Sequence, residues 1–124
     1  MKKLFTLLSI LLSVTASAQS MREVLPSMPD TICRLLTRNN MLDFPDYLDT
    51  QMKAEVRNRL SGNSEMKTLT DDYTLIQVSE SSTLQFKLLP TSKSKLILAA
   101  YTYFLNDSIA DSQLSIYDIG WKQL

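Results

Sequence analysis

The chain offers few of the residue types on which catalysis depends. It contains no histidine, which excludes Ser-His-Asp triads, Cys-His pairs and histidine-ligated zinc. Its only glycines are Gly62 and Gly120, so a glycine-rich loop for phosphate cannot form. We therefore expect a protein that is not an enzyme and that has no cofactor.

Three aspartates are the best remaining candidates for chemistry. Asp43, Asp46 and Asp49 are spaced to lie on one side of a helix, where carboxylate oxygens suit calcium. Acidic residues in a first helical turn also stabilise the helix through capping and its dipole. We favour this structural explanation and expect no metal site. A small carboxylate-dependent hydrolase or a calcium-binding protein is our third functional hypothesis.

Aromatic residues concentrate near the end of the sequence, at Tyr101, Tyr103, Tyr117 and Trp121. Exposed aromatic clusters are typical of surfaces that bind other proteins. We expect these side chains to form a binding face on the open side of a sheet. The alternative is that some lie in the core and others singly on the surface. The 13 basic residues are scattered and balanced by 13 acidic ones, which argues against nucleic acid as a partner.

Cys33 is the only cysteine, so an intramolecular disulfide is impossible. Its neighbours Ile32 and Leu35 favour a buried thiol that packs as a small apolar group. A reactive thiol or an intermolecular bridge is the alternative.

The first 18 residues have the three-part order of a cleavable signal peptide. Two lysines precede an apolar run over 4–14, and Ala16-Ser17-Ala18 suits the cleavage site. The run is too short to span a bilayer, so we expect no membrane span in the mature form. No cysteine follows the cleavage site to carry a lipid. The sequence predicts an exported protein, periplasmic or extracellular, that is not lipid-anchored.

Helical spacing dominates the first half of residues 19–124, which we expect to form one domain. Apolar residues predict a helix over 21–38, with Asn39-Asn40 as its stop. A second helix is predicted over 44–60 and is ended by Gly62. Its apolar stripe consists of Tyr47, Leu48, Met52, Val56 and Leu60.

Alternation of apolar and polar residues predicts strands in the second half. These strands span about 73–79, 83–89, 95–104 and 112–119, and 67–70 is a possible short leading strand. Short connections favour an antiparallel meander. The predicted fold class is α+β, with the two N-terminal helices packed on one face of a four-stranded antiparallel sheet.

Several segments carry a resemblance to a known family: 52–56, 64–73, 81–84 with 87–90, and Trp121-Lys122-Gln123-Leu124. The chain resembles a family of secreted proteins of the Bacteroidales whose function is unknown. The resemblance implies export into a Gram-negative envelope and supplies no catalytic residues. It also implies that family members extend further at the C-terminus.

Two further expectations follow from this resemblance and from the predicted architecture. Helix-loop-helix followed by four strands is similar to the repeat of β-lactamase inhibitor proteins and to small outer-membrane assembly lipoproteins, which favours protein binding. The bacterial lineage makes Ser108, within Asp107-Ser108-Ile109, a possible acceptor for O-glycans. Asp30-Thr31-Ile32 has the same pattern.

The leading hypothesis is a non-enzymatic envelope module that binds another protein or an envelope polymer through its open sheet face or edge. The alternative is a structural or accessory half-domain. Such a half-domain would self-associate, as a homodimer, or complete a larger two-repeat fold.

Overall fold

The computed structural model describes residues 19–106 and 108–124. The predicted signal peptide, residues 1–18, lies outside the described residues, and so does Asp107. Among the described residues, no helix combines the length and the apolar character needed to cross a membrane.

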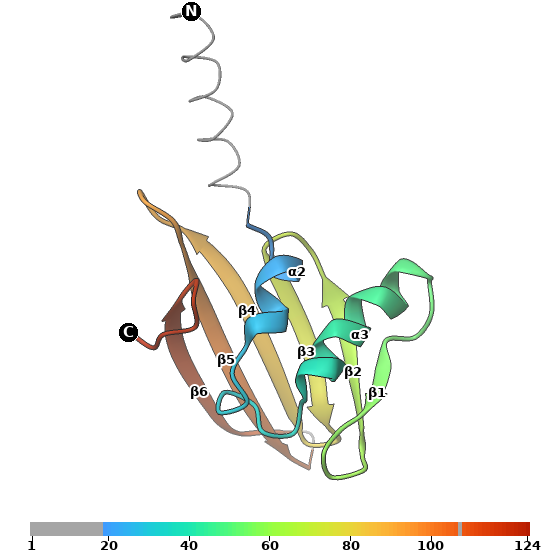
Figure 1. The fold of residues 1–124 in the computed structure, drawn as a ribbon. Helices are drawn as coiled ribbons and strands as arrows, with labels where there is room; N and C mark the ends of the chain where they lie inside the picture. Colours follow the sequence, from blue (N-terminus) through green and yellow to red (C-terminus); the bar gives the residue numbers. More distant parts are fainter. Residues whose placement is uncertain (1–18, 107) are drawn as a thin grey trace, which may run out of the picture.

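The described chain is built around one antiparallel sheet of six strands in sequence order (Figure 1). Every strand pairs with the next one along the chain, so the sheet is a meander with β1 and β6 at its edges. The strands are β1 (Glu55–Arg57), β2 (Asn63–Leu69), β3 (Tyr73–Ser79), β4 (Ser82–Pro90), β5 (Lys95–Leu105) and β6 (Ser108–Asp118). The strands predicted over 73–79, 83–89, 95–104 and 112–119 correspond to β3–β6.

The predicted fold class is wrong, because the described chain is mostly β. The sheet has two strands more than the expected four, and the helical segments are short. They are α2 (Met21–Val24), the 3-10 turn η1 (Leu25–Ser27) and α3 (Arg38–Asp49). The likeness to a helix-loop-helix plus four-stranded repeat loses its basis with this correction.

The first predicted helix, 21–38, is helical only as far as Ser27. Met28 has a ψ of 125°, which is extended backbone. Proline at position 29 explains this, since it disfavours the helical conformation of the residue before it. From Pro29 to Leu36 the chain forms turns and crosses to the next helix as an irregular loop.

The second predicted helix, 44–60, begins and ends earlier than expected. Thr37 and Asn40 form a capping box, in which each side chain accepts a hydrogen bond from the other residue's backbone N–H, at 3.0 and 2.9 Å. Asn39-Asn40 therefore lies in the first turn of α3 and does not stop a helix. After Asp49 the chain leaves the helix, and Val56 belongs to β1.

A hairpin between β1 and β2 replaces the end of the predicted helix. The backbone N–H of Asn58 donates to the carbonyl of Gly62 at 2.9 Å, and the Asn58 side chain accepts from the N–H groups of Leu60 and Gly62. Local bonds of this kind let asparagine close a turn. Leu60, expected to face the core, is 77% exposed at this turn.

The hydrophobic core lies between the helices and one face of the sheet, which we call the inner face. Alternate residues of the central strands point into it, and α2 and α3 cover it (Figure 1). The fully buried large side chains include Phe44, Met41, Leu25, Ile76, Phe86 and Leu88. In Figure 1 the helices lie over the middle of the sheet, and β6 extends beyond them.

Candidate functional site

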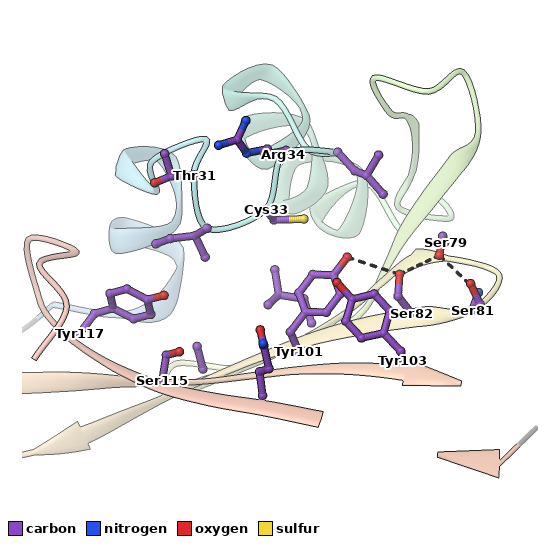
Figure 2. A pocket seen from close by; sticks show the side chains of 15 residues that line it. Thr31, Cys33, Arg34, Ser79, Ser81, Ser82, Tyr101, Tyr103, Ser115 and Tyr117 are labelled. Atoms are coloured by element: carbon purple, nitrogen blue, oxygen red, sulfur yellow. Dashed lines mark hydrogen bonds between the residues drawn. The ribbon is translucent and has the colours of Figure 1, made fainter. Parts of the chain in front are cut away.

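A hollow of about 430 Å³ opens on the inner face, where the helices no longer cover β5 and β6. One wall is the loop that follows η1, and the other is the sheet. Figure 2 shows Tyr101, Tyr103 and Tyr117 directed from the sheet toward this loop. We call the site the tyrosine hollow. Its polar lining includes Thr31, Arg34, Ser79, Ser82, Gln113 and Ser115.

Strand register explains why the tyrosines share one face. Tyr101 and Tyr103 are two residues apart on β5, so their side chains point the same way. Tyr117 pairs with Ile97 of β5, which is a core residue of the inner face. We expected the aromatic residues on the face away from the helices. The structure places these three on the helical face instead, at its uncovered end.

Tyr101 and Tyr103 form the centre of the hollow. Their ring centroids are 4.8 Å apart and their planes are tilted by 40°. Tyr101 is half-buried, whereas Tyr103 is 46% exposed and presents its ring to the opening. A rigid aromatic surface of this kind provides a large contact area at a low cost in side-chain entropy.

Hydroxyl groups continue from Tyr101 along the rim of the hollow. The Tyr101 hydroxyl donates to Ser82 Oγ at 3.5 Å, and Ser82 and Ser79 share a hydrogen bond of 2.7 Å (Figure 2). The Ser81 N–H donates to Ser79 Oγ at 3.3 Å. Serine hydroxyls both donate and accept hydrogen bonds. This row of hydroxyl groups can therefore bind either a donor or an acceptor of a ligand.

Burial raises the pKa of two groups that line the hollow, the Tyr101 hydroxyl and the Cys33 thiol. Desolvation raises the pKa of Tyr101 to about 12, partly offset by the hydrogen bond to Ser82. Burial also raises the pKa of the Cys33 thiol, which is 3% exposed. Thiolate is the reactive form of cysteine, so a raised pKa makes Cys33 a poor nucleophile near neutral pH.

Trp121, the fourth predicted residue, lies in the core and does not line the hollow. Its side chain is 5% exposed and packs edge-on against Phe86, with ring centroids 5.0 Å apart. The indole N–H donates to the carbonyl of Val24 at 2.9 Å. The ring centroids of Trp121 and Tyr117 are 5.9 Å apart, so Trp121 packs beside one of the tyrosines that line the hollow.

The serines of β3 and β4 and the loop residues were not predicted to be part of this site. Ser82 is 3% exposed, and its burial beside the aromatic residues depends on tertiary contacts that local sequence spacing does not reveal. Ser108, the possible glycan acceptor, is exposed at the start of β6, but its neighbour Asp107 lies outside the described residues. Glycosylation of Ser108 stays a prediction.

The three aspartates of α3 do not assemble into a site. Asp49 forms an ion pair with Arg22 of α2, with an N···O distance of 2.6 Å. In the part of the chain that the structure describes, no group of three or more acidic or cysteine side chains could hold a metal ion.

Sequence comparison places the chain in a family. Residues 13–124 match the family model described as "Protein of unknown function (DUF3256)". The chain belongs to this family. No curated protein matches it.

A solved structure with a similar fold supports a comparison with this DUF3256 protein. It is the structure of a domain of an uncharacterized protein from Porphyromonas gingivalis W83, with a TM-score of 0.67 and 20% sequence identity. The match covers 87% of this chain and 54% of that chain. The similarity shows a shared fold, and this chain spans about half the length of its neighbour.

Proposed function

We propose that this DUF3256 protein is an exported, non-enzymatic module of the cell envelope that binds another protein through the tyrosine hollow. The observation that carries the proposal is the composition of the hollow. Paired tyrosine rings lie beside a chain of serine hydroxyls, in a concave site that is open to solvent.

This composition suits recognition of a polypeptide. Tyrosine and serine are the residues that protein-binding loops of antibodies use most, because tyrosine supplies rigid contact area and serine adaptable hydrogen bonds. Arg34 and Gln113 add a cation and an amide at opposite walls of the hollow. Interfaces of moderate affinity have this mixture of aromatic surface and polar rim.

Two features support the other parts of the proposal, namely that the protein is exported and that it is not an enzyme. The basic start, the apolar run over 4–14 and Ala16-Ser17-Ala18 favour export. The raised pKa values of Tyr101 and Cys33 leave both groups protonated near neutral pH, in the form that hydrogen-bonds and does not attack.

Chemical crosslinking in the native host tests the proposal. Tagged wild-type protein and the variants Tyr103→Ser and Tyr73→Ser are compared by mass spectrometry of crosslinked partners. Tyr73 is the matched control, because it lies on the outer face and its hydroxyl bonds Gln85. We expect a partner protein that is retained by Tyr73→Ser and lost by Tyr103→Ser. Equal recovery with both variants would refute the hollow as the binding site.

A second candidate function is self-association, which the outer face favours. Leu114 and Ile116 of β6 are 71% and 41% exposed, and their cross-strand neighbours are Ala100 and Leu98. This apolar surface would suit a second copy of the chain. Light scattering over a range of protein concentrations measures the oligomeric state. A dimer favours the second candidate function, and a monomer at all concentrations excludes it.

A further inference from the structure

A second hollow, of about 510 Å³, adjoins the tyrosine hollow. Leu35, Ser79 and Ser81 line both hollows, and Figure 2 shows the two serines at the end of the tyrosine hollow away from Tyr117. The second hollow is also lined by the turn between β1 and β2, which includes Leu60. We call this site the hairpin hollow. Together the two hollows form one longer concave surface.

The loop that follows η1 is tied to this turn, which holds the two hollows in place relative to one another. The backbone N–H of Arg59 donates to the carbonyl of Leu35 at 2.9 Å. The Arg59 guanidinium also forms an ion pair with Asp30 of the loop, at an N···O distance of 2.8 Å. Cys33 and Leu36 of the same loop are buried in the core. A site held in this way binds without first ordering a loop, which reduces the entropic cost of association.

Leu60 gives the hairpin hollow an apolar contact point. Its side chain is 77% exposed, and Leu35, which is half-buried, lines the same hollow. A single exposed leucine is common on protein surfaces. Leu60, however, lines a concave site next to an aromatic one, so an apolar side chain of a partner would contact it and leave water. Burial of apolar surface at such an anchor supplies much of the energy of an interface.

Each hollow contains one charged residue, and the two charges are of opposite sign. Among the described residues, Arg34 is the only charged one that lines the tyrosine hollow, and Glu80 is the only one that lines the hairpin hollow. Both side chains are exposed, and neither forms an ion pair within the described chain. Complementary charges position a partner and exclude wrong ones. The occupant is therefore expected to carry an acidic group at the tyrosine hollow and a basic group at the hairpin hollow.

An extended stretch of polypeptide has the form that this surface requires. Side chains on one side of an extended chain recur every two residues, so consecutive ones on that side can enter adjoining hollows. The backbone between them would cross the serines that the two hollows share. Each residue of a peptide backbone has one donor and one acceptor, and the hydroxyls of Ser79 and Ser81 can bind either.

We propose that the partner protein presents an extended segment that crosses both hollows. An acidic side chain of this segment lies beside Arg34, a basic side chain lies beside Glu80, and an apolar side chain packs against Leu60. This inference rests on the proposed function and specifies the partner. It also assigns a role to the exposed leucine of the hairpin, which the core does not use.

The test selects ligands for the purified protein from a random library of displayed twelve-residue peptides. We expect the enriched peptides to share an acidic residue, a basic residue and a large apolar residue. The same library is then selected on Arg34→Glu, which should enrich peptides that carry a basic residue in place of the acidic one. Failure to enrich any peptide, or the same charge preference for Arg34→Glu as for the wild type, would overturn the proposal.

Variants at exposed positions test each contact with synthetic copies of the selected peptides. We expect Leu60→Ser to weaken binding about tenfold, whereas Leu105→Ser, at a similarly exposed leucine outside both hollows, leaves it unchanged. Arg34→Glu and Glu80→Lys should each weaken binding about fivefold. Arg38→Glu, at an exposed arginine that lines neither hollow, should not. Equal affinities for the two leucine variants, or for the two arginine variants, would overturn the proposal.

Tyr103→Ser separates this inference from the proposed function. Peptides that lose affinity for Tyr103→Ser, but bind Leu60→Ser and Glu80→Lys as they bind the wild type, retain the tyrosine hollow and refute its extension. Peptides that bind Tyr103→Ser as they bind the wild type refute the tyrosine hollow, and the proposed function with it. A dimer in light scattering that Leu60→Ser abolishes would identify a second copy as the occupant and overturn the partner segment.

Discussion

The Trp121 indole N–H donates to the Val24 carbonyl at 2.9 Å, which ties the last turn of the described chain to its first helix. We predict that Trp121→Phe lowers the free energy of unfolding by about 1–2 kcal/mol, because one buried hydrogen bond is lost while much of the ring packing remains. Trp121→Ala should lower the free energy of unfolding by about 3–5 kcal/mol, since it also leaves a cavity against Phe86. Urea unfolding measures both. Equal losses for the two variants would mean that the hydrogen bond contributes all of the stabilisation.

Tyr101 should make stability depend on alkaline pH. Its pKa is raised from 10.0 to about 12, so the folded protein holds the proton more tightly than the unfolded chain does. The resulting stabilisation is fully present below pH 10 and is lost as the pH rises from 10 toward 12. We expect the wild type to lose stability between pH 10 and 12 more steeply than Tyr101→Phe. Parallel pH profiles for the two proteins would contradict the burial of this hydroxyl.

Arg22 and Asp49 link α2 to α3 through two hydrogen bonds, at 2.6 and 2.9 Å. The bond to Arg22 lowers the pKa of Asp49 below its ordinary value of 3.8. A lowered carboxyl pKa stabilises the folded state above pH 3.8, and this contribution disappears as the pH falls through the lowered value. We therefore expect Asp49→Asn to have a slightly lower Tm than the wild type at pH 7 and an equal Tm near pH 2.

Asp43 supplies the control for the Arg22–Asp49 pair, because it forms no ion pair within the described chain. Asp43→Asn should not reproduce the pH-dependent difference. Both side chains of the pair are exposed, so added salt should also reduce the effect of Asp49→Asn. A difference from the wild type that persists at pH 2 would point to a cause other than the ion pair.

Asn58 anchors the hairpin that the sequence did not predict. Its side-chain amide donates to Ser64 Oγ at 2.9 Å and to the Val78 carbonyl at 3.3 Å, and it is buried. We predict that Asn58→Ala lowers the free energy of unfolding by about 2–3 kcal/mol, because buried acceptors and turn N–H groups lose their partner. Ser64→Ala should lower the free energy of unfolding by only about 1 kcal/mol, since the Val78 carbonyl still accepts a hydrogen bond from Asn58. Chemical denaturation that ranks the two variants in the opposite order would contradict this network.

The strands were predictable from sequence because each central strand has one buried face. Leu84, Phe86 and Leu88 alternate with polar residues, and the structure buries all three. The helices were harder to predict. Leu48, Met52, Val56 and Leu60 fit a helical stripe in sequence, but Met52 and Leu60 are exposed and Val56 lies in a strand. The turn bonds of Asn58 and the capping box of Thr37 outweigh that spacing.

The candidate site was predictable only in part. The residue types and the two-residue spacing of Tyr101 and Tyr103 indicate a shared face, but they do not tell which face the helices cover. Trp121 lies in the core because the turn at Gly120, closed by Asp118, brings it back over the sheet. Such long-range packing leaves no signal in local spacing. The contribution of Ser79 and Ser82 likewise depends on tertiary contacts.

Site-specific photocrosslinking tests most directly whether the tyrosine hollow binds a protein. Benzoylphenylalanine is incorporated at position 103, in the hollow, or at position 73, on the outer face, and cells of the native host are irradiated. We predict a crosslinked protein of defined mass from position 103 and none from position 73. Crosslinks from position 73 alone, or from neither position, would contradict the account.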